Sequence, residues 1–186
     1  MLKIRKMRTK LKRAAIAGTA VLTLVTMSQG TAHAASAFTG VLSPEPDTGM
    51  ICAQPSGGNL TNGTRVVLGS CEGYNFIWSF YPKAPTGQSD WFTIQLGNMC
   101  LDAENDAGGS PNNDGDKVQI WQCLPNDMQQ QWYPWPEANG NYEFVNRFNT
   151  SMVLDARSDS GWGSTVIGTP LQLWTANYQP QQEWTM

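Results

Sequence analysis

The chain has 186 residues, of which 40% are hydrophobic and 15% are charged, and its formal net charge is −3. Seven of its twelve Lys and Arg residues precede position 14, so the part beyond residue 37 carries five basic and fifteen acidic residues, a net charge of −10. This charge excludes nucleic acid as a partner, because phosphate backbones are bound by clustered Lys and Arg. The single histidine, His33, also lies within the first 37 residues, which excludes imidazole-based catalysis and metal binding beyond them.

The N-terminal segment predicts export. A basic stretch is followed by an apolar run over residues 14–27 and then by the A-x-A sequence at residues 32–34, which together are typical of a secretory signal peptide. We predict a signal peptide over residues 1–34, cleaved after Ala34 or after Ala37, and a secreted product of bacterial origin. Polar residues interrupt the apolar run, and a membrane span needs roughly 20 apolar residues, so no membrane insertion is expected.

The remainder of the chain predicts an all-β protein. Gly, Pro, Asn, Asp, Ser and Thr recur throughout it, as expected of short strands joined by turns, and no helical periodicity follows residue 37. Four cysteines in an exported protein predict two disulfides. A zinc site would require C-x2-C pairs, whereas the cysteines of the two pairs are 19 and 23 residues apart. We therefore expect no metal and no cofactor.

The Asp- and Asn-rich stretch over residues 105–116 has some features of a calcium loop, because oxygen-bearing side chains alternate over residues 112–116. An EF-hand loop, however, needs Gly at its sixth position and a closing Glu. Lys117 stands at the sixth position and no Glu closes the run, so a solvated turn is predicted.

One pattern occurs twice in full and once in reduced form. A full copy has an Asp, a Gln 17 residues later, a Trp two residues beyond that Gln, and a closing Q-x-W. The full copies comprise Asp102, Gln119, Trp121 and residues 130–132 in the first, and Asp155, Gln172, Trp174 and residues 182–184 in the second. The upstream copy keeps a cysteine pair and a closing Trp78, but has Gln54, Val67 and Gly69 where the others have Asp, Gln and Trp.

Three such units predict a closed barrel. Each unit of roughly 50 residues has about four short strands, such as residues 92–96 and 142–148, which suits a threefold β-barrel capped by hairpins. Turn signals over residues 82–87 and 139–140 separate the strands. The period alone would also fit propeller blades, but three blades are too few for that architecture.

The openings, strands and closings of these copies resemble those of the ricin B-type lectins, the family that includes family-13 carbohydrate-binding modules. The matching motifs are Cys-Leu-Asp at residues 100–102, the strand at residues 118–123 and the two Q-x-W closings. The resemblance extends from about Thr39 to Met186. It implies a β-trefoil with pseudo-threefold symmetry over residues 38–186, with repeats at about 38–84, 85–135 and 136–186. It also implies that the Q-x-W tryptophans pack in the core.

The resemblance further implies one sugar site in each full copy. An ionised Asp accepts hydroxyl protons, an amide donates and accepts, and a Trp ring covers the C–H face of a sugar. The sugar-binding residues expected in the first site are Asp102, Gln119, Trp121, Gln129 and Gln130, and those in the second are Asp155, Gln172, Trp174, Gln181 and Gln182. The family usually has Asn at the positions of Gln129 and Gln181, which bears on the sugar preference.

The same register pairs Cys52 with Cys71 and Cys100 with Cys123, so that each disulfide closes a loop within its own copy. A loop of this length is expected to contribute roughly 3 kcal/mol on the chain-entropy model. The last copy has Val153 and Ala176 instead, so apolar packing is expected there.

Three functions follow from these features. The leading prediction is a non-catalytic lectin with two sites for galactose-like or xylose-based glycans. The alternative is a targeting or interaction subunit of a secreted toxin or enzyme complex, in which a separately encoded protein binds the aromatic residues of the reduced copy, among them Tyr74, Phe76, Phe80 and Tyr81. A glycoside hydrolase with two catalytic carboxylates is disfavoured, because these modules accompany catalytic domains. Trp162, between two glycines, either extends the second site or packs against the barrel.

Overall fold

The described part of the structure, a computed structural model, comprises residues 37–45, 50–73, 75–82, 91–104, 111, 113–157 and 166–186. The predicted signal peptide, the predictions for Tyr74 and Trp162, and most of the calcium-like stretch lie outside these residues. Within them, no helix is long and apolar enough to cross a membrane.

The regular secondary structure of the described residues consists of thirteen strands and three short 3-10 helices. The strands are β1 (Phe38–Val41), β2 (Ser43–Pro44), β3 (Ile51–Pro55), β4 (Thr64–Ser70), β5 (Ile77–Pro82), β6 (Phe92–Leu96), β7 (Met99–Ala103), β8 (Val118–Gln122), β9 (Trp132–Pro136), β10 (Tyr142–Asn146), β11 (Met152–Ala156), β12 (Leu171–Thr175) and β13 (Trp184–Thr185). The 3-10 helices are η1 (Ser56–Gly58), η2 (Met128–Gln130) and η3 (Pro180–Gln182).

Alternation of apolar and polar residues explains the strands. In β5, Trp78 and Phe80 are fully buried, whereas Ile77 and Tyr81, which flank them, are exposed, as the period of two requires. The strand predicted over residues 142–148 ends earlier, at Asn146, because the Asn146 Oδ1 accepts a hydrogen bond from the backbone N–H of Phe148 and turns the chain.

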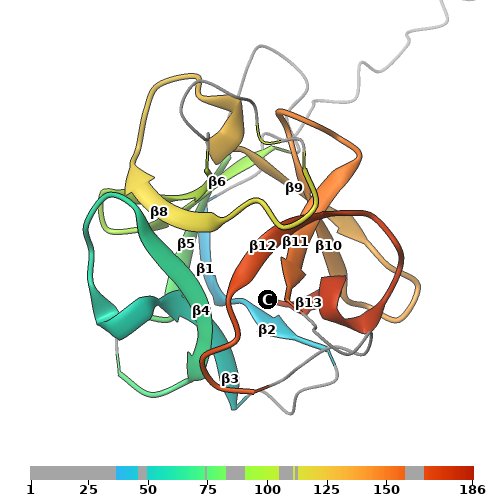
Figure 1. Ribbon diagram of the computed structural model, residues 1–186, viewed down its shortest axis with the longest axis horizontal. Coiled ribbons are helices and arrows are strands. Elements are labelled where there is room, and N and C mark those ends of the chain that lie inside the picture. The colour runs from blue at the N-terminus through green and yellow to red at the C-terminus, as the bar shows by residue number, and fades with distance from the viewer. Residues whose placement is uncertain are drawn as a thin grey trace, which may run out of the picture. The chain divides into compact units, whose positions relative to one another are not determined.

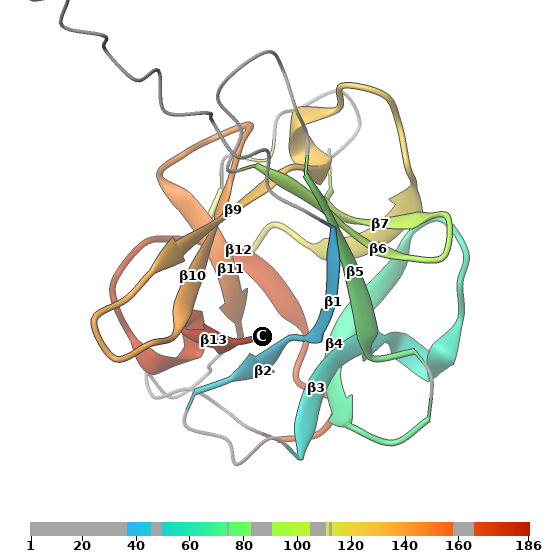
Figure 2. The ribbon, with the colours of Figure 1, turned by 180° about the vertical axis from the view of Figure 1, so that it is seen from behind.

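Six antiparallel pairings close a barrel, which Figure 2 shows from behind. They run from β1 to β5, β6, β9, β10, β13 and back to β2, which continues from β1. A closed ring leaves no unpaired edge. Its interior is filled by large apolar side chains, of which the largest are Trp78, Trp132, Trp184, Phe80 and Phe144.

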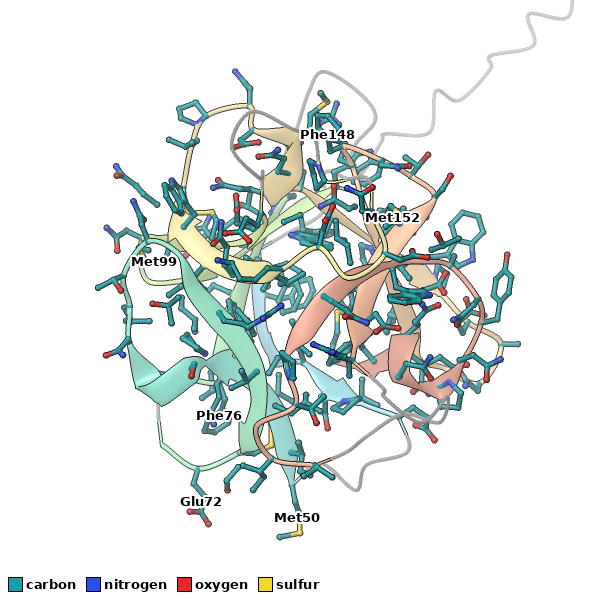
Figure 3. The ribbon with its side chains drawn as sticks, in the orientation of Figure 1. Met50, Glu72, Phe76, Met99, Phe148 and Met152 are labelled. Atoms are coloured by element: carbon teal, nitrogen blue, oxygen red, sulfur yellow. A yellow bond between two sulfur atoms is a disulfide. The ribbon has the colours of Figure 1, made fainter. Side chains whose placement is uncertain are left out.

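Three hairpins cap this barrel, formed by β3 with β4, β7 with β8, and β11 with β12 (Figure 1). The hairpins begin at equivalent residues, Ile51, Met99 and Met152, and Figure 3 labels the two methionines in neighbouring hairpins. One barrel with three equivalent caps is the predicted β-trefoil, and propeller blades are excluded.

In each hairpin, the turn between the two strands contains a glycine that hydrogen-bonds to the next repeat around the axis. Gly63, Gly115 and Gly168 have φ of 85°, 95° and 94°. Their N–H groups donate to the carbonyls of Ile120, Leu173 and Leu68, at 3.0, 2.9 and 2.7 Å, each in the following repeat around the axis. A non-glycine residue pays about 1–2 kcal/mol for this left-handed conformation, so the three glycines are required by the turns.

A side chain supports two of these three junctions. The Asn62 Oδ1 accepts from the Gln122 N–H at 2.7 Å, and the Asp114 Oδ1 accepts from the Thr175 N–H at 2.6 Å. Asp114 is thus engaged in a contact between repeats. At the third junction the equivalent residue is Ile167, whose side chain has no acceptor.

Both predicted disulfides are confirmed. Cys52 is bonded to Cys71 and Cys100 to Cys123, with Cα–Cα distances of 5.2 and 5.0 Å. In the last repeat, Val153 is buried at the corresponding position. Apolar packing therefore replaces the disulfide there, as expected.

Replacing Gly115 by Ala should lower the free energy of unfolding by about 1–2 kcal/mol, because the residue has a positive φ. Space does not limit this change, since an added Cβ would meet only the Gln172 Oε1, at 4.0 Å. Urea denaturation measures the effect. Gly40→Ala is the control: Gly40 lies outside the positive-φ residues and its added Cβ would make ordinary contacts from 3.5 Å. Equal destabilisation by both variants would contradict the role of the turn.

Candidate functional site

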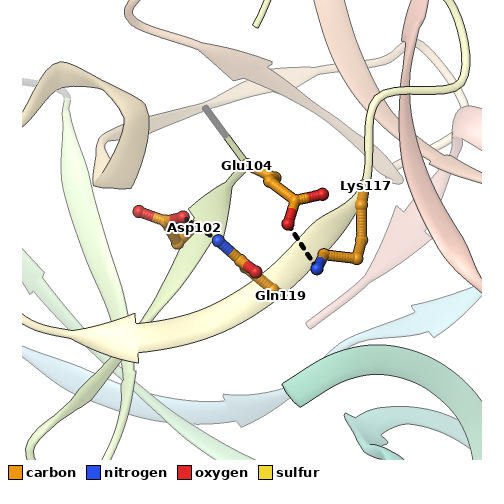
Figure 4. A network of polar contacts seen from close by, with 4 residues as sticks. All are labelled: Asp102, Glu104, Lys117 and Gln119. Atoms are coloured by element: carbon orange, nitrogen blue, oxygen red, sulfur yellow. Dashed lines mark hydrogen bonds and ion pairs between the residues drawn. The ribbon is translucent and has the colours of Figure 1, made fainter. Parts of the chain in front are cut away.

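The first candidate site is centred on Asp102 in β7. Asp102 lies directly opposite Gln119 of β8 in the antiparallel register, and the Gln119 Nε2 donates to the Asp102 Oδ1 at 2.9 Å (Figure 4). The other carboxylate oxygen, Oδ2, accepts from the Gln130 Nε2 at 3.0 Å. Asp102 is only 4% exposed. Two amide groups therefore fix the orientation of a carboxylate that is almost buried.

The third repeat reproduces this arrangement in β11 and β12. The Gln172 Nε2 donates to the Asp155 Oδ1 at 2.8 Å, and the Gln182 Nε2 donates to the Asp155 Oδ2 at 3.1 Å. Asp155 is 2% exposed. The 17-residue spacing found in the sequence thus corresponds to two opposed residues of one hairpin, and in both copies it brings Asp and Gln together.

Gln130 and Gln182, which were predicted to bind sugar, contact the two aspartates. Both side chains are fully buried. Besides contacting Asp102, the Gln130 amide donates to the carbonyl of Gln122 and accepts from the N–H of Leu124. Gln182 does the same with the carbonyl of Thr175 and the N–H of Asn177. Because both the nitrogen and the oxygen of each amide are already engaged, this geometry suits Gln130 and Gln182 to positioning Asp102 and Asp155.

The closing tryptophans belong to the core, as predicted. Trp132 and Trp184 are fully buried, and their Nε1–H groups donate to the carbonyls of Leu101 and Leu154, at 3.0 and 3.1 Å. Trp78 makes the equivalent bond to Ala53 at 2.9 Å. Each bond holds the residue immediately before the Asp or Gln54 position. The barrel core therefore fixes the strand that carries the site.

The stacking candidates are accessible. Trp121 is 36% exposed at the end of β8, and Trp174 is partly exposed at the same position in β12. Gln129 is half-buried in η2, and Gln181 is buried in η3. Each site thus combines a nearly buried carboxylate with an aromatic ring that faces solvent.

Two of the predicted sugar-binding residues have a buried amide oxygen that lacks a donor. Among the described residues, the Gln119 Oε1 and the Gln181 Oε1 have no hydrogen-bond partner. An unpaired buried acceptor costs roughly 1–3 kcal/mol. A ligand hydroxyl placed there would relieve this cost, so these two atoms are well suited to accept from a bound molecule.

Burial also shifts the titration of the two aspartates. It raises the pKa of Asp102 and that of Asp155 to about 6, against the opposing effect of the Gln hydrogen bonds. Both carboxyl groups are therefore mostly ionised at neutral pH. Each oxygen accepts one amide hydrogen bond and has further lone-pair capacity, so a carboxylate can accept hydroxyl protons as well.

In the reduced first repeat, the space next to the Trp position is filled by another side chain. A Cβ added to Gly69, which stands where the other repeats have Trp, would lie 1.5 Å from the Gln54 Nε2. The Gln54 side chain therefore occupies the volume in which an aromatic residue would begin. A larger residue at position 69 would therefore require the Gln54 side chain to move.

One component of the sites was not predicted from the sequence. A Cβ added to Gly63 would lie 3.8 Å from the Trp121 ring and 3.9 Å from the Gln119 Oε1, so the turn before β4 borders the site of the second repeat. A signal was present: a glycine stands four residues before the Gln or Val67 position in all three copies.

Gln130→Met should lower the free energy of unfolding by about 2–4 kcal/mol, because an apolar side chain of similar size removes the bonds that Gln130 makes to the Asp102 Oδ2, the Gln122 carbonyl and the Leu124 N–H. Urea denaturation measures the loss. Gln129→Met is the matched control, because the Gln129 side-chain amide has no hydrogen-bond partner among the described residues. If Gln130→Met were no more destabilising than Gln129→Met, the bracing role would be wrong.

Comparisons with known proteins agree with this fold. The family model for the ricin-type beta-trefoil lectin domain matches residues 39–185. No curated protein matches the chain in sequence.

Solved structures share the fold. The ricin B-like lectin of Macrolepiota procera in complex with lactose has a TM-score of 0.58 and 22% identity, over 81% of this chain and 95% of that one. The designed threefold symmetric protein ThreeFoil has a TM-score of 0.60 and 20% identity, over 72% and 88%. An exo-beta-1,3-galactanase from Clostridium thermocellum has a TM-score of 0.59 and 18% identity, over 75% of this chain but only 30% of that one.

The family match covers most of the chain, the barrel with three caps has the expected architecture, and the repeated Asp, Gln and Trp positions come together in two of the caps. The chain belongs to the ricin-type β-trefoil lectin family.

Proposed function

We propose that the protein is a secreted lectin that binds carbohydrate at two sites, in the β7–β8 hairpin and in the β11–β12 hairpin. The observation that carries this proposal is the repeated pairing of an ionised, amide-braced Asp with a partly exposed Trp on the same hairpin. The first repeat is not a site in this proposal, because Gln54 fills the corresponding volume.

The chemistry of each site suits a sugar ring. A carboxylate with remaining lone pairs accepts protons from neighbouring hydroxyl groups in charge-assisted hydrogen bonds. The Trp ring covers the apolar C–H face of the sugar. The unpaired oxygens of Gln119 and Gln181 would accept further hydroxyl protons. We propose galactose-like or xylose-based glycans as ligands; the lactose in the complex of the Macrolepiota procera lectin supports the first class.

The positions of the carboxylates favour sugar binding over catalysis. Glycoside hydrolysis needs two carboxyl groups that flank one bond. Asp102 and Asp155 lie in different hairpins, and Glu104, two residues beyond Asp102, forms an ion pair with Lys117 (Figure 4). The similarity to a galactanase covers only 30% of that chain, so it does not favour a hydrolase.

The interaction-subunit alternative has narrower support. Phe80, which the sequence suggested as part of a protein-facing surface, is fully buried and stacks on Phe38 at 4.6 Å between ring centroids. Of the suggested residues, Tyr81 is exposed on β5, and Ile77, four residues before it on the same strand, is also exposed. This smaller apolar surface is the one available to a separately encoded secreted protein.

Trp121→Ala and Trp174→Ala should each reduce the number of sugars bound per chain from two to one, and the double variant should bind none. The ring supplies the stacking surface, and its exposure keeps the structural cost of truncation small. Calorimetric titration with galactose, lactose and xylo-oligosaccharides measures stoichiometry and affinity. Trp135→Ala is the control, because Trp135 is 54% exposed on β9, outside both sites. Undiminished binding by the double variant would contradict the proposal.

Sugar affinity at both sites should fall about tenfold between pH 7 and pH 5. The pKa of each aspartate is raised to about 6, so roughly nine-tenths of the carboxyl groups are ionised at pH 7 and one-tenth at pH 5. Protonation removes the charged acceptor, so binding weakens as the pH falls. Titrations at intermediate pH, with circular dichroism to monitor folding, test this dependence. A constant affinity in the folded protein would show that the ionised form is not required.

A further inference from the structure

The second-repeat site borders a basic residue from the first repeat. Arg65 of β4 lies directly opposite Gln119 of β8, and Thr64 lies opposite Ile120. Directly opposed residues of an antiparallel pair have their side chains on the same face, so Arg65 and Gln119 share one face. The adjoining turn points the same way, since a Cβ at Gly63 would approach both Trp121 and the Gln119 Oε1.

Arg65 and Gln119 each have a buried polar atom without a partner. The Arg65 Nε–H is a donor, the Gln119 Oε1 is an acceptor, and neither has a hydrogen-bond partner among the described residues. Gln119 is 4% exposed, and its orientation is fixed because its Nε2 donates to Asp102. A single hydroxyl group satisfies both atoms, because it can accept from one and donate to the other.

The third-repeat site differs at this position. Lys117 stands at the position equivalent to Arg65, opposite Gln172. Its ammonium group, however, is engaged in an ion pair with Glu104. The first repeat has Ser56 at the position of Glu104, so Arg65 has no equivalent carboxylate. Beside the reduced first repeat, Pro170 lies opposite Val67 and offers no donor.

We propose that Arg65 is a sugar-binding residue of the second-repeat site and recognises a hydroxyl that also donates to the Gln119 Oε1. This inference rests on the proposed lectin function. The ligand group is a neutral hydroxyl, because a carboxylate would supply no proton to Gln119 and would face the charge of Asp102. The two sites are therefore inequivalent, and the second repeat recognises one more hydroxyl than the third.

Arg65→Met tests this proposal, because it keeps the apolar stem and removes every donor. In the Trp174→Ala background, where the second-repeat site acts alone, lactose affinity should fall by about 3- to 10-fold. The matched control is Lys117→Met in the Trp121→Ala background, where lactose affinity of the third-repeat site should change less than twofold. Thermal unfolding of each variant monitors the fold.

A series of monodeoxy methyl galactosides separates recognition from structural support. One deoxy sugar should bind the Arg65 protein more weakly than the parent sugar does, and this difference should disappear in Arg65→Met. Unchanged lactose affinity in Arg65→Met would overturn the inference and leave the lectin function intact. Uniform weakening towards all sugars would assign Arg65 a structural role and also overturn it. Absence of sugar binding at both sites of the unsubstituted protein would overturn the lectin function and the inference together.

Discussion

The bond between a Q-x-W glutamine and a buried aspartate is the interaction on which both sites depend. Folding raises the pKa of Asp102 to about 6, so keeping the carboxylate ionised at neutral pH opposes folding by on the order of 3 kcal/mol. This opposition appears as the pH rises from about 4 to 6. The opposition would be larger without the Gln119 and Gln130 amides, whose hydrogen bonds to the carboxylate lower its pKa. Two residues beyond Gln130, Trp132 fills the barrel core, so a single tripeptide links the stability of the fold to the orientation of the site.

Each candidate site is supported by contacts from the preceding repeat. The Asp114 carboxylate of the second repeat accepts from Thr175 of the third, and Asn62 of the first accepts from Gln122 of the second. These bonds hold the ends of β12 and β8, at the residues that follow Trp174 and Trp121. A threefold architecture therefore places each preceding turn beside the next candidate site. Differences in the strand after that turn, such as Arg65 where the next repeat has Lys117, can make the two candidate sites differ.

Spacing in the sequence predicted a threefold barrel, and the family resemblance predicted the β-trefoil, the disulfides and the grouping of Asp102 with Gln119. The grouping can be read from spacing because residues opposed across one hairpin keep a constant separation. Spacing did not reveal burial, so Gln130 was grouped with the sugar-contacting residues although its side chain is enclosed. The contribution of Gly63 and Arg65 depends on register between hairpins of different repeats, which a local pattern does not encode. The occupation of the Gly69 position by Gln54 likewise requires three-dimensional packing.

The most direct test of the account is a titration followed through the side-chain amide signals of glutamine by nuclear magnetic resonance. Lactose and xylo-oligosaccharides would be added to the isotope-labelled protein, with the amides assigned by Gln→Asn substitution. The account predicts saturable shifts of the Gln119 and Gln172 amide signals with at least one of these sugars, and no shift for Gln54, which fills the reduced site. A folded protein in which both the Gln119 and Gln172 signals remain unchanged, or in which the Gln54 signal alone shifts, would contradict it.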